Sequence, residues 1–395
     1  MGTIHSSNDV TGNNLHLLTL TPFYPFEGDD ANGCFVSEPL EWLAKLGVWH
    51  TVMAVQPFYR GSHRGGNSAV RGEWLRYFSL PGGLGLPMAG TFVFARIVPQ
   101  LRETHRAQPF DLIHAHGPLP CGHAAMLLSK ELNLPFVVSV HGRDAFSTVQ
   151  VGGPSGESCR RISRLVYGGA SRVICISGHV REAVLEGMDR TCRTSVVSNG
   201  VDPGFFSPVS EIAAPALKIL SVGNLIPIKG HESLIRSVAA LSSEFPALEL
   251  DIIGDGPERG RLEKLVEELQ IAGKVHFHGR QSRAQVAEAM QQCTVFVLPS
   301  RYEGLGCVYL EAMSCGKPVI GCRGQGIAEI IQPATNGFLI DPDNDGELSV
   351  ILRALFREPS RRSNLGRVAR ETILNGFTLE RQAQNLARLY RECLQ

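Results

Sequence analysis

The stretch Leu298–Ile320, LPSRYEGLGCVYLEAMSCGKPVI, joins the end of an apolar run to a glycine-rich turn and then to a helical pattern. The apolar residues 294–298 predict a buried parallel strand, which the following proline breaks. Gly304-Leu305-Gly306 then lead into a helix that is expected to run to about Ser314. Free N–H groups and the positive dipole end at such a helix start favour an anion, and glycines let a phosphate approach the backbone. The stretch therefore predicts a phosphate site, with a diphosphate as its ligand.

Two acidic residues flank this turn. Glu303 lies just before the helix, and Glu311 follows after seven intervening residues. At a rise of about 1.5 Å per residue, the two carboxylates stand roughly 12 Å apart. The paired carboxylates of a glycosidase stand within about 5 to 10 Å across one bond. Glu303 and Glu311 are therefore expected to contact different parts of one long ligand, and a nucleotide sugar has that length.

The same residues resemble a known signature. Glu303, seven residues and Glu311, followed by Ala312-Met313 and residues 315–320 (CGKPVI), resemble the donor signature of the retaining glycosyltransferases of family 4. The resemblance implies that Glu303 contacts the transferred sugar and that Glu311 binds the ribose hydroxyls. It implies that the amides of Gly304, Leu305 and Gly306 bind the diphosphate. It also implies an α/β chain of GT-B fold, with two Rossmann-like domains whose parallel sheets face a deep cleft.

Two segments of the first half fit that resemblance. Gly33 ends the loop after the first predicted strand, where the family places the donor phosphates, although Asn32 replaces the first glycine of the usual pair. His141-Gly142-Arg143-Asp144 stands at the carboxyl end of a buried strand, which is the edge where open parallel sheets bind ligands. The resemblance implies that His141 approaches the transferred sugar.

The second half supplies further candidates. Lys229 matches the lysine that the family places on the diphosphate, whereas Asn224 stands where the family has an arginine. A lysine is a point charge and an arginine a bidentate fork, so the phosphates lose one fixed cation here. Gly279 and Arg280 end a predicted strand where the family seats the nucleotide base. The candidate catalytic residues are thus His141, Lys229 and Glu303.

Composition narrows the remaining classes. The chain has 395 residues, enough for two domains, and its 38 basic residues balance 38 acidic ones, so no basic footprint for nucleic acid is present. The ten cysteines include no CxxC pair and favour reduced thiols in a cytoplasmic protein. We see no secretory signal, and we interpret the match of Met1-Gly2 and Ser6 to the N-myristoylation pattern as a coincidence. No apolar run reaches the ~18 residues that a membrane span needs.

The pattern of strands and prolines suggests a domain plan. We expect a disordered N-terminus over residues 1–14, an acceptor-side domain over 15–208, and a linker over 209–216. A nucleotide-sugar-binding domain over 217–377 and a helix over 378–395 that crosses back to the first domain would follow. The apolar segment Leu84–Ile97 is predicted to cover the core, while an acceptor pocket or a peripheral contact with the inner face of the membrane remain alternatives.

Metal binding is not expected. His114 and His116 alternate to one face of a strand but lack a third ligand, and Asp341 and Asp343 lie in an acidic loop that more simply caps a helix. A metal-dependent transferase that uses the two aspartates is the alternative.

Together these features predict a retaining hexosyltransferase for polysaccharide or glycoconjugate biosynthesis. It would need no cofactor and would move a hexose from a nucleoside-diphosphate sugar to a hydroxyl of a glycan, a lipid-linked compound or a small molecule. A UDP-sugar is the expected donor, and a GDP-sugar is the alternative. A nucleotide-sugar epimerase or phosphorylase of the same fold, or a non-catalytic nucleotide-sugar-binding protein, stays open. The acceptor and the oligomeric state also stay open.

Overall fold

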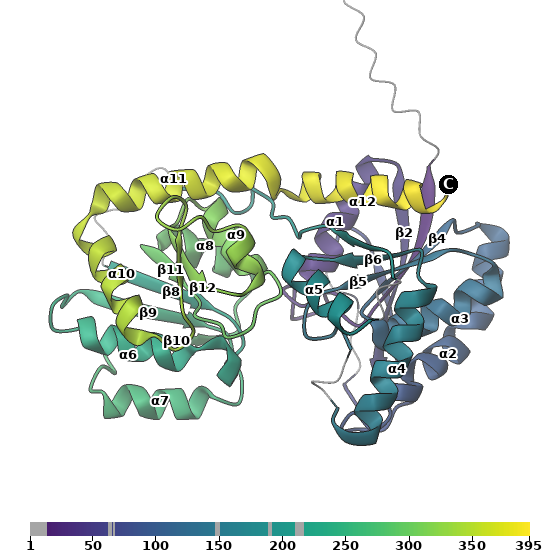
Figure 1. The fold of residues 1–395 in the computed structure, drawn as a ribbon, viewed down its shortest axis with the longest axis horizontal. Helices are drawn as coiled ribbons and strands as arrows, with labels where there is room; N and C mark the ends of the chain where they lie inside the picture. The colour runs from purple at the N-terminus through teal and green to yellow at the C-terminus, as the bar shows by residue number, and fades with distance from the viewer. Residues whose placement is uncertain (1–13, 62–64, 66–67, 147–150, 189–191, 210–216) are drawn as a thin grey trace, which may run out of the picture.

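The chain folds into two α/β halves that lie side by side (Figure 1). The computed structural model describes residues 14–61, 65, 68–146, 151–188, 192–209 and 217–395. Nearly all of the N-terminal segment expected to be disordered, and residues 210–216 of the expected linker, lie outside these described residues.

The first half is built on a parallel sheet of seven strands in the order β3-β2-β1-β4-β5-β6-β7. Successive strands neighbour each other outward from the centre on both sides, which is the doubly wound arrangement. The strands are β1 (Leu15–Thr21), β2 (Val48–Pro57), β3 (Gly72–Tyr77), β4 (Leu112–His116), β5 (Phe136–Val140), β6 (Arg172–Cys175) and β7 (Thr194–Val196).

The second half repeats this plan with six parallel strands in the order β10-β9-β8-β11-β12-β13. The two Rossmann-like sheets predicted from the sequence are thereby confirmed. The strands are β8 (Leu217–Val222), β9 (Leu248–Ile253), β10 (Val275–Gly279), β11 (Val295–Val297), β12 (Val319–Cys322) and β13 (Phe338–Ile340).

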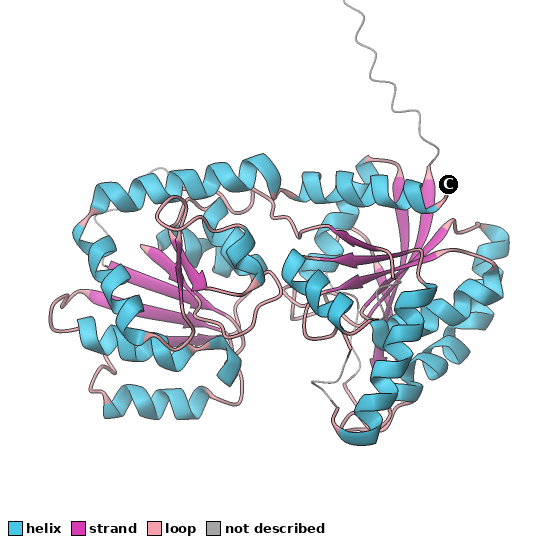
Figure 2. Cartoon of the chain, viewed as in Figure 1, coloured by secondary structure: helices cyan, strands magenta, loops and turns pink. Residues whose placement is uncertain are grey.

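Helices cover both faces of each sheet (Figure 2). The first half carries α1 (Cys34–Lys45), α2 (Leu86–Ala107), α3 (His123–Leu132), α4 (Gly153–Gly169) and α5 (Gly178–Glu186). The second half carries α6 (His231–Leu241), α7 (Arg259–Glu268), α8 (Arg283–Gln292), α9 (Cys307–Ser314), α10 (Asp345–Arg357) and α11 (Pro359–Gly376), and the chain ends in α12 (Leu379–Cys393). Short helical turns lie at Pro118–Gly122, Pro227–Lys229 and Gly326–Glu329.

The central strands are apolar throughout because both of their faces are buried. In β1, Leu17 and Leu18 are completely buried, but they point to opposite faces and belong to different apolar clusters. Ile219 and Leu220 of β8 divide in the same way. Alternate side chains of a strand point to opposite faces, so a sheet that helices cover on both sides needs near-continuous apolar runs.

Helix α12 belongs in space to the first half, although it follows α11 of the second half (Figure 1). Its residues at helical spacing, Ala383, Leu386 and Tyr390, pack with residues of α1 in one apolar cluster. The Tyr390 hydroxyl also hydrogen-bonds Nδ1 of His114 at 2.9 Å. The last helix thus ties the two halves together.

Different residues of the segment Leu84–Ile97 pack in the core, line a cavity or are exposed at the surface. Val93 is buried in the core, Leu86 lines a cavity, and Leu84 and Met88 expose 66% and 54% of their surface. No helix in the described part of the chain is both long enough and apolar enough to cross a membrane.

Candidate active site

The two sheets bring their ligand-binding edges together. In each sheet the order reverses between the first and fourth strands, at β1 and β4 in one and at β8 and β11 in the other. Loops diverge from the carboxyl ends of strands at such a point and leave a crevice for a ligand. Ser177 of the first half donates a hydrogen bond of 2.6 Å to the Gly304 carbonyl of the second half. The crevices therefore meet where the two halves touch.

The glycine-rich turn after β11 is shaped by close approach. A Cβ on Gly304 would lie 2.6 Å from the carbonyl oxygen of His141, and one on Gly306 would lie 2.6 Å from the ring of Tyr309. Gly306 also has a φ of +79°, a conformation that side chains rarely adopt. Leu305 is buried beside them, and α9 begins at the next residue after the turn. The turn predicted from the sequence thus lies at a helix N-terminus against the first half.

Lys229 and Glu303 form an ion pair in this crevice. The Lys229 Nζ lies 2.5 Å from Oε2 of Glu303, with 18% and 15% of the two side chains exposed. Lys229 ends the short turn after β8 and Glu303 precedes α9, so the loops at the switch point bring them together. Gln325 accepts the backbone N–H of Glu303 at 2.9 Å and fixes this residue. Two of the three candidate catalytic side chains are therefore in direct contact.

Glu311, which the sequence predicts to bind the ribose of a ligand, is buried and paired with an arginine. It is only 3% exposed, and its Oε1 accepts a charged hydrogen bond from Arg283. Arg283 also contacts Glu38 of α1, with Nη2 and Oε1 2.6 Å apart. Burial opposes the charge of Arg283, but the coulombic effect of Glu311 and the other nearby acids outweighs it and raises its pKa. Arg283 thus joins a carboxylate of each half, and neither Arg283 nor Glu38 was predicted.

The remaining donor-side candidates lie at the rim of the second sheet. Asn224 is exposed after β8, and Gly279 ends β10 with a φ of +67°. Arg280 crosses to the first half, where its Nη1 lies 2.6 Å from Oδ2 of Asp29. Within the described residues, Arg280 and Arg283 are therefore cations that reach from the second half to acids of the first.

Gly33 and its neighbour shape the loop after β1. A Cβ on Gly33 would lie 2.3 Å from the backbone carbon of Phe23, and its φ is +68°. Asn32, which stands where the family resemblance places a first glycine, donates a side-chain hydrogen bond of 2.6 Å to the Tyr24 carbonyl. Gly33 directly precedes α1, so the first half also offers a helix N-terminus to the site.

His141 is held as a neutral ring. Burial lowers its pKa to about 4, and burial lowers the pKa of His116 well below the usual value. His116 Nδ1 lies 3.0 Å from His141 Nε2, and the rings stack. Nδ1 of His141 is buried and has no hydrogen-bond partner among the described residues. One nitrogen of this ring is therefore left unpaired by the described residues.

Glu329 ends the short helical turn Gly326–Glu329 and contacts the first half. Its carboxylate accepts the N–H groups of Gly178 at 2.9 Å and His179 at 2.6 Å, at the start of α5. A carboxylate at a helix N-terminus satisfies free donors and the dipole. Glu329 thus joins the halves at the edge of the site.

A cavity of about 700 Å³ opens in the first half, and it is lined by Asp144, whose carboxylate accepts the backbone N–H of His141 at 3.1 Å. It lies between the loops that follow β1, β2, β3 and β4, and Arg280 of the second half closes one side. Its walls include the aromatic residues Phe23, Phe26, Tyr59, Trp74 and Tyr77 and the polar residues Asp29, Asn32, Gln56, Arg60, Ser79 and Asp144.

The structure gives the acidic loop at Asp341 a role in packing. Asp341 pairs with Arg323 at 3.0 Å and Asp343 with Arg301 at 2.7 Å. Asn344 accepts the N–H of Glu347 and caps α10, as the sequence suggested. The described residues contain no group of three or more histidines, cysteines or acids arranged to hold a metal ion.

Comparison with known proteins agrees with this architecture. Residues 36–205 match the family model described as Glycosyltransferase Family 4, and residues 205–372 match Glycosyl transferases group 1. An uncharacterised glycosyltransferase of Methanocaldococcus jannaschii is 28% identical over 286 residues, which cover 72% of this chain and 76% of the relative. The N-acetyl-alpha-D-glucosaminyl L-malate synthase of Bacillus anthracis is 25% identical over 308 residues, 75% of this chain and 79% of the relative.

Solved structures show the same fold. A sucrose-phosphate synthase from Thermosynechococcus elongatus superposes with a TM-score of 0.78 at 23% identity, covering 95% of this chain and 98% of that one. The Anabaena protein HepE in complex with UDP-glucose gives a TM-score of 0.73 at 20% identity, covering 96% and 100%. The two family models, the glycosyltransferase relatives and the paired parallel sheets agree: this chain is a family 4 glycosyltransferase of GT-B fold.

Proposed function

We propose that this glycosyltransferase moves a hexose from a nucleoside-diphosphate sugar to a hydroxyl acceptor, with retention of the anomeric configuration and without a metal ion. The observation that carries the proposal is the Lys229–Glu303 pair directly before the N-terminus of α9. A partly buried cation and a helix N-terminus stabilise an anion together, while the carboxylate beside them accepts hydrogen bonds from hydroxyl groups.

Each candidate residue takes a role from its position. Lys229 and the amides of Gly304, Leu305 and Gly306 stabilise the charge that develops on the leaving diphosphate. Glu303 releases Lys229 to the phosphate and accepts hydrogen bonds from the sugar hydroxyls. The free Nδ1 of the neutral His141 contacts the sugar from the first half.

The donor spans both halves in this proposal. The base lies at Gly279 and Arg280, the ribose at Glu311, and the phosphates between Gly33, Asn224 and Lys229. A UDP-sugar is the proposed donor, because HepE, which shares this fold, is known in complex with UDP-glucose. The acceptor hydroxyl enters from the cavity that Asp144 lines and attacks the face of the sugar that the diphosphate leaves, where a departing phosphate oxygen takes its proton.

Substitution of the ion pair tests this function. Glu303→Gln and Lys229→Ala should each lower the rate of sugar transfer at least 100-fold, the effect of losing one preorganised electrostatic contact, which is about 10²–10³. Melting temperatures measured in parallel should change far less. Glu371→Gln, which removes one acid of an exposed pair with Arg367, is the matched control and should keep the wild-type rate. Variants at 229 and 303 with wild-type transfer rates would remove both residues from the mechanism.

A further inference from the structure

One residue that lines the cavity of about 700 Å³, Gln56, has a side-chain oxygen with no hydrogen-bond partner in the described part of the chain. Gln56 of β2 is 4% exposed, and its Nε2 donates a hydrogen bond of 2.9 Å to the carbonyl of Gly61. A carbonyl only accepts, so the amide nitrogen must face Gly61 and the Oε1 must face away from it. This Oε1 is buried without a hydrogen-bond partner among the described residues. A buried acceptor without a partner is costly, and a hydroxyl group in the cavity that Gln56 lines would remove this cost by donating a hydrogen bond to it.

The charges around the cavity disfavour an anion. Among the described residues of the wall two are basic: Arg280 is paired with Asp29, and Arg60 is exposed. Asp144 also lines the cavity; its carboxylate accepts the backbone N–H of His141 at 3.1 Å, and burial raises its pKa to about 6. A phosphate or carboxylate that entered would meet Asp144 rather than an unpaired, buried cation. The interior therefore suits uncharged hydroxyl groups.

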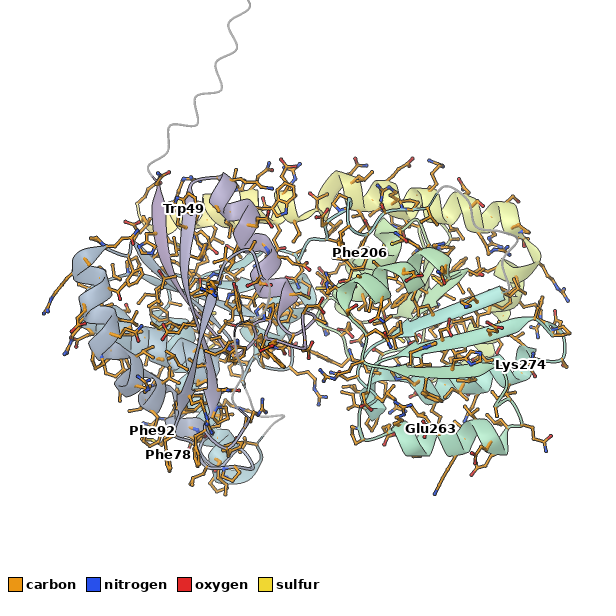
Figure 3. The ribbon with its side chains drawn as sticks, turned by 180° about the vertical axis from the view of Figure 1, so that it is seen from behind. Trp49, Phe78, Phe92, Phe206, Glu263 and Lys274 are labelled. Atoms are coloured by element: carbon orange, nitrogen blue, oxygen red, sulfur yellow. The ribbon has the colours of Figure 1, made fainter. Side chains whose placement is uncertain are left out.

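An apolar rim continues from the cavity to the outer surface. Tyr59 and Leu80 line the cavity and still expose 44% and 50% of their surface. Next to them in the chain, the rings of Phe58 and Phe78 stack with centroids 5.4 Å apart and expose 44% and 54%. Figure 3 shows Phe78 beside Phe92 at the far end of the first half from Trp49. A continuous exposed apolar patch next to a ligand cavity indicates that the ligand has an apolar part.

We propose that the acceptor is an uncharged hydroxylated ring that carries an apolar aglycone. The ring lies in the cavity with one hydroxyl donating to Gln56 and others to Asp144, and its apolar faces contact the aromatic walls. The aglycone lies along Tyr59, Leu80, Phe58 and Phe78. This assignment rests on the proposed function and adds the chemical class of the acceptor.

Acceptor kinetics test the proposal. Initial rates are measured with the best nucleotide-sugar donor and with methyl glucoside, octyl glucoside below its micellar concentration, and glucose 6-phosphate. Octyl glucoside should have a KM at least tenfold below that of methyl glucoside, because each fully buried methylene contributes roughly fourfold. Glucose 6-phosphate should be no better than methyl glucoside. Equal KM values for the two glucosides, or a preference for the phosphate, would overturn the proposal.

Variants assign the effect to the residues. Gln56→Leu should raise the acceptor KM about 3- to 10-fold, the value of one hydrogen bond between neutral groups. Gln100→Leu removes an exposed amide that bonds Glu73 outside the cavity and should leave the acceptor KM unchanged. Phe78→Ser should bring the KM values for octyl glucoside and methyl glucoside closer together. An unchanged ratio of these two KM values would contradict the role of the rim.

Two further measurements complete the test. The first shows whether a failed transfer reaction reflects the wrong acceptor class or the wrong proposed function, and the second shows whether the natural acceptor is a membrane glycolipid or a soluble glycoside. Donor hydrolysis without any acceptor reports the donor site alone: hydrolysis without transfer to any ring would refute this acceptor, and loss of both would refute the proposed function. An alkyl glucoside held in phosphatidylcholine vesicles is compared with soluble octyl glucoside. Faster transfer in vesicles identifies a glycolipid as the natural source, and faster transfer in solution identifies a small glycoside; both agree with the proposal.

Discussion

Replacement of Arg283 by methionine should destabilise the protein strongly. Arg283→Met keeps the unbranched, apolar stem but leaves Glu311 without its charged partner. The side chain of Glu311 is 4% exposed and that of Arg283 is 12% exposed, so solvent cannot replace the lost charge. Removal of one partner from a buried pair costs about 3–5 kcal/mol. At roughly 2–4 °C per kcal/mol for a domain of this size, the melting temperature should fall by about 6 to 20 °C.

Thermal unfolding followed by circular dichroism measures this effect. Arg388→Met is the matched control, because Arg388 of α12 is 74% exposed and lies 3.9 Å from Glu392. An exposed pair of this kind contributes at most about 1 kcal/mol. The double variant Arg283→Met/Glu311→Gln should recover part of the loss, since no unpaired charge then stays buried. A loss below about 1 kcal/mol in Arg283→Met would refute the buried link between the two halves.

Two further predictions concern single polar groups of the site. Burial raises the pKa of Asp144 from 3.8 to about 6, a shift that corresponds to about 3 kcal/mol. Because the folded state binds the proton more tightly than the unfolded state, stability should fall as the pH rises from about 4 to about 6. Melting curves at pH 4 and pH 7 should show Asp144→Asn stabilised relative to the wild type only at pH 7, and an equal difference at both pH values would contradict the shift. Asn224→Arg places a bidentate cation at the proposed phosphate position, so donor titration should give a dissociation constant for the donor roughly 3- to 10-fold lower. An unchanged or weaker affinity would show that Asn224 lies away from the phosphates.

The two sheets could be predicted because most of their strands are recognisable from their own sequence. Buried strands such as β5 and β11 are short apolar runs bounded by turns, and a parallel sheet follows from their alternation with helices. Strand β3, GEWLRY, was missed since it lies at the sheet edge and only Leu75 and Tyr77 are fully buried. The signal of an edge strand is weak where one side has no neighbour.

Contacts between the halves could not be predicted in the same way. Arg283 lies 245 positions from Glu38 and 28 positions from Glu311, and no local pattern relates the three. Their contact arises only when α1, α8 and α9 pack together. The Lys229–Glu303 pair, 74 positions apart, became visible from the resemblance of two loops to one family and not from spacing. The burial of Glu311 is likewise a property of the assembled fold.

Nucleotide release from a panel of UDP-, GDP- and ADP-sugars tests the central claim most directly. The wild-type protein should release UDP from a UDP-hexose in the presence of a hydroxyl acceptor, and chelation of metal ions should not stop it. The sugar in the product should keep the anomeric configuration of the donor. Failure to release nucleotide from any donor in the panel, despite tight binding of one of them, would contradict the assignment of this site to sugar transfer.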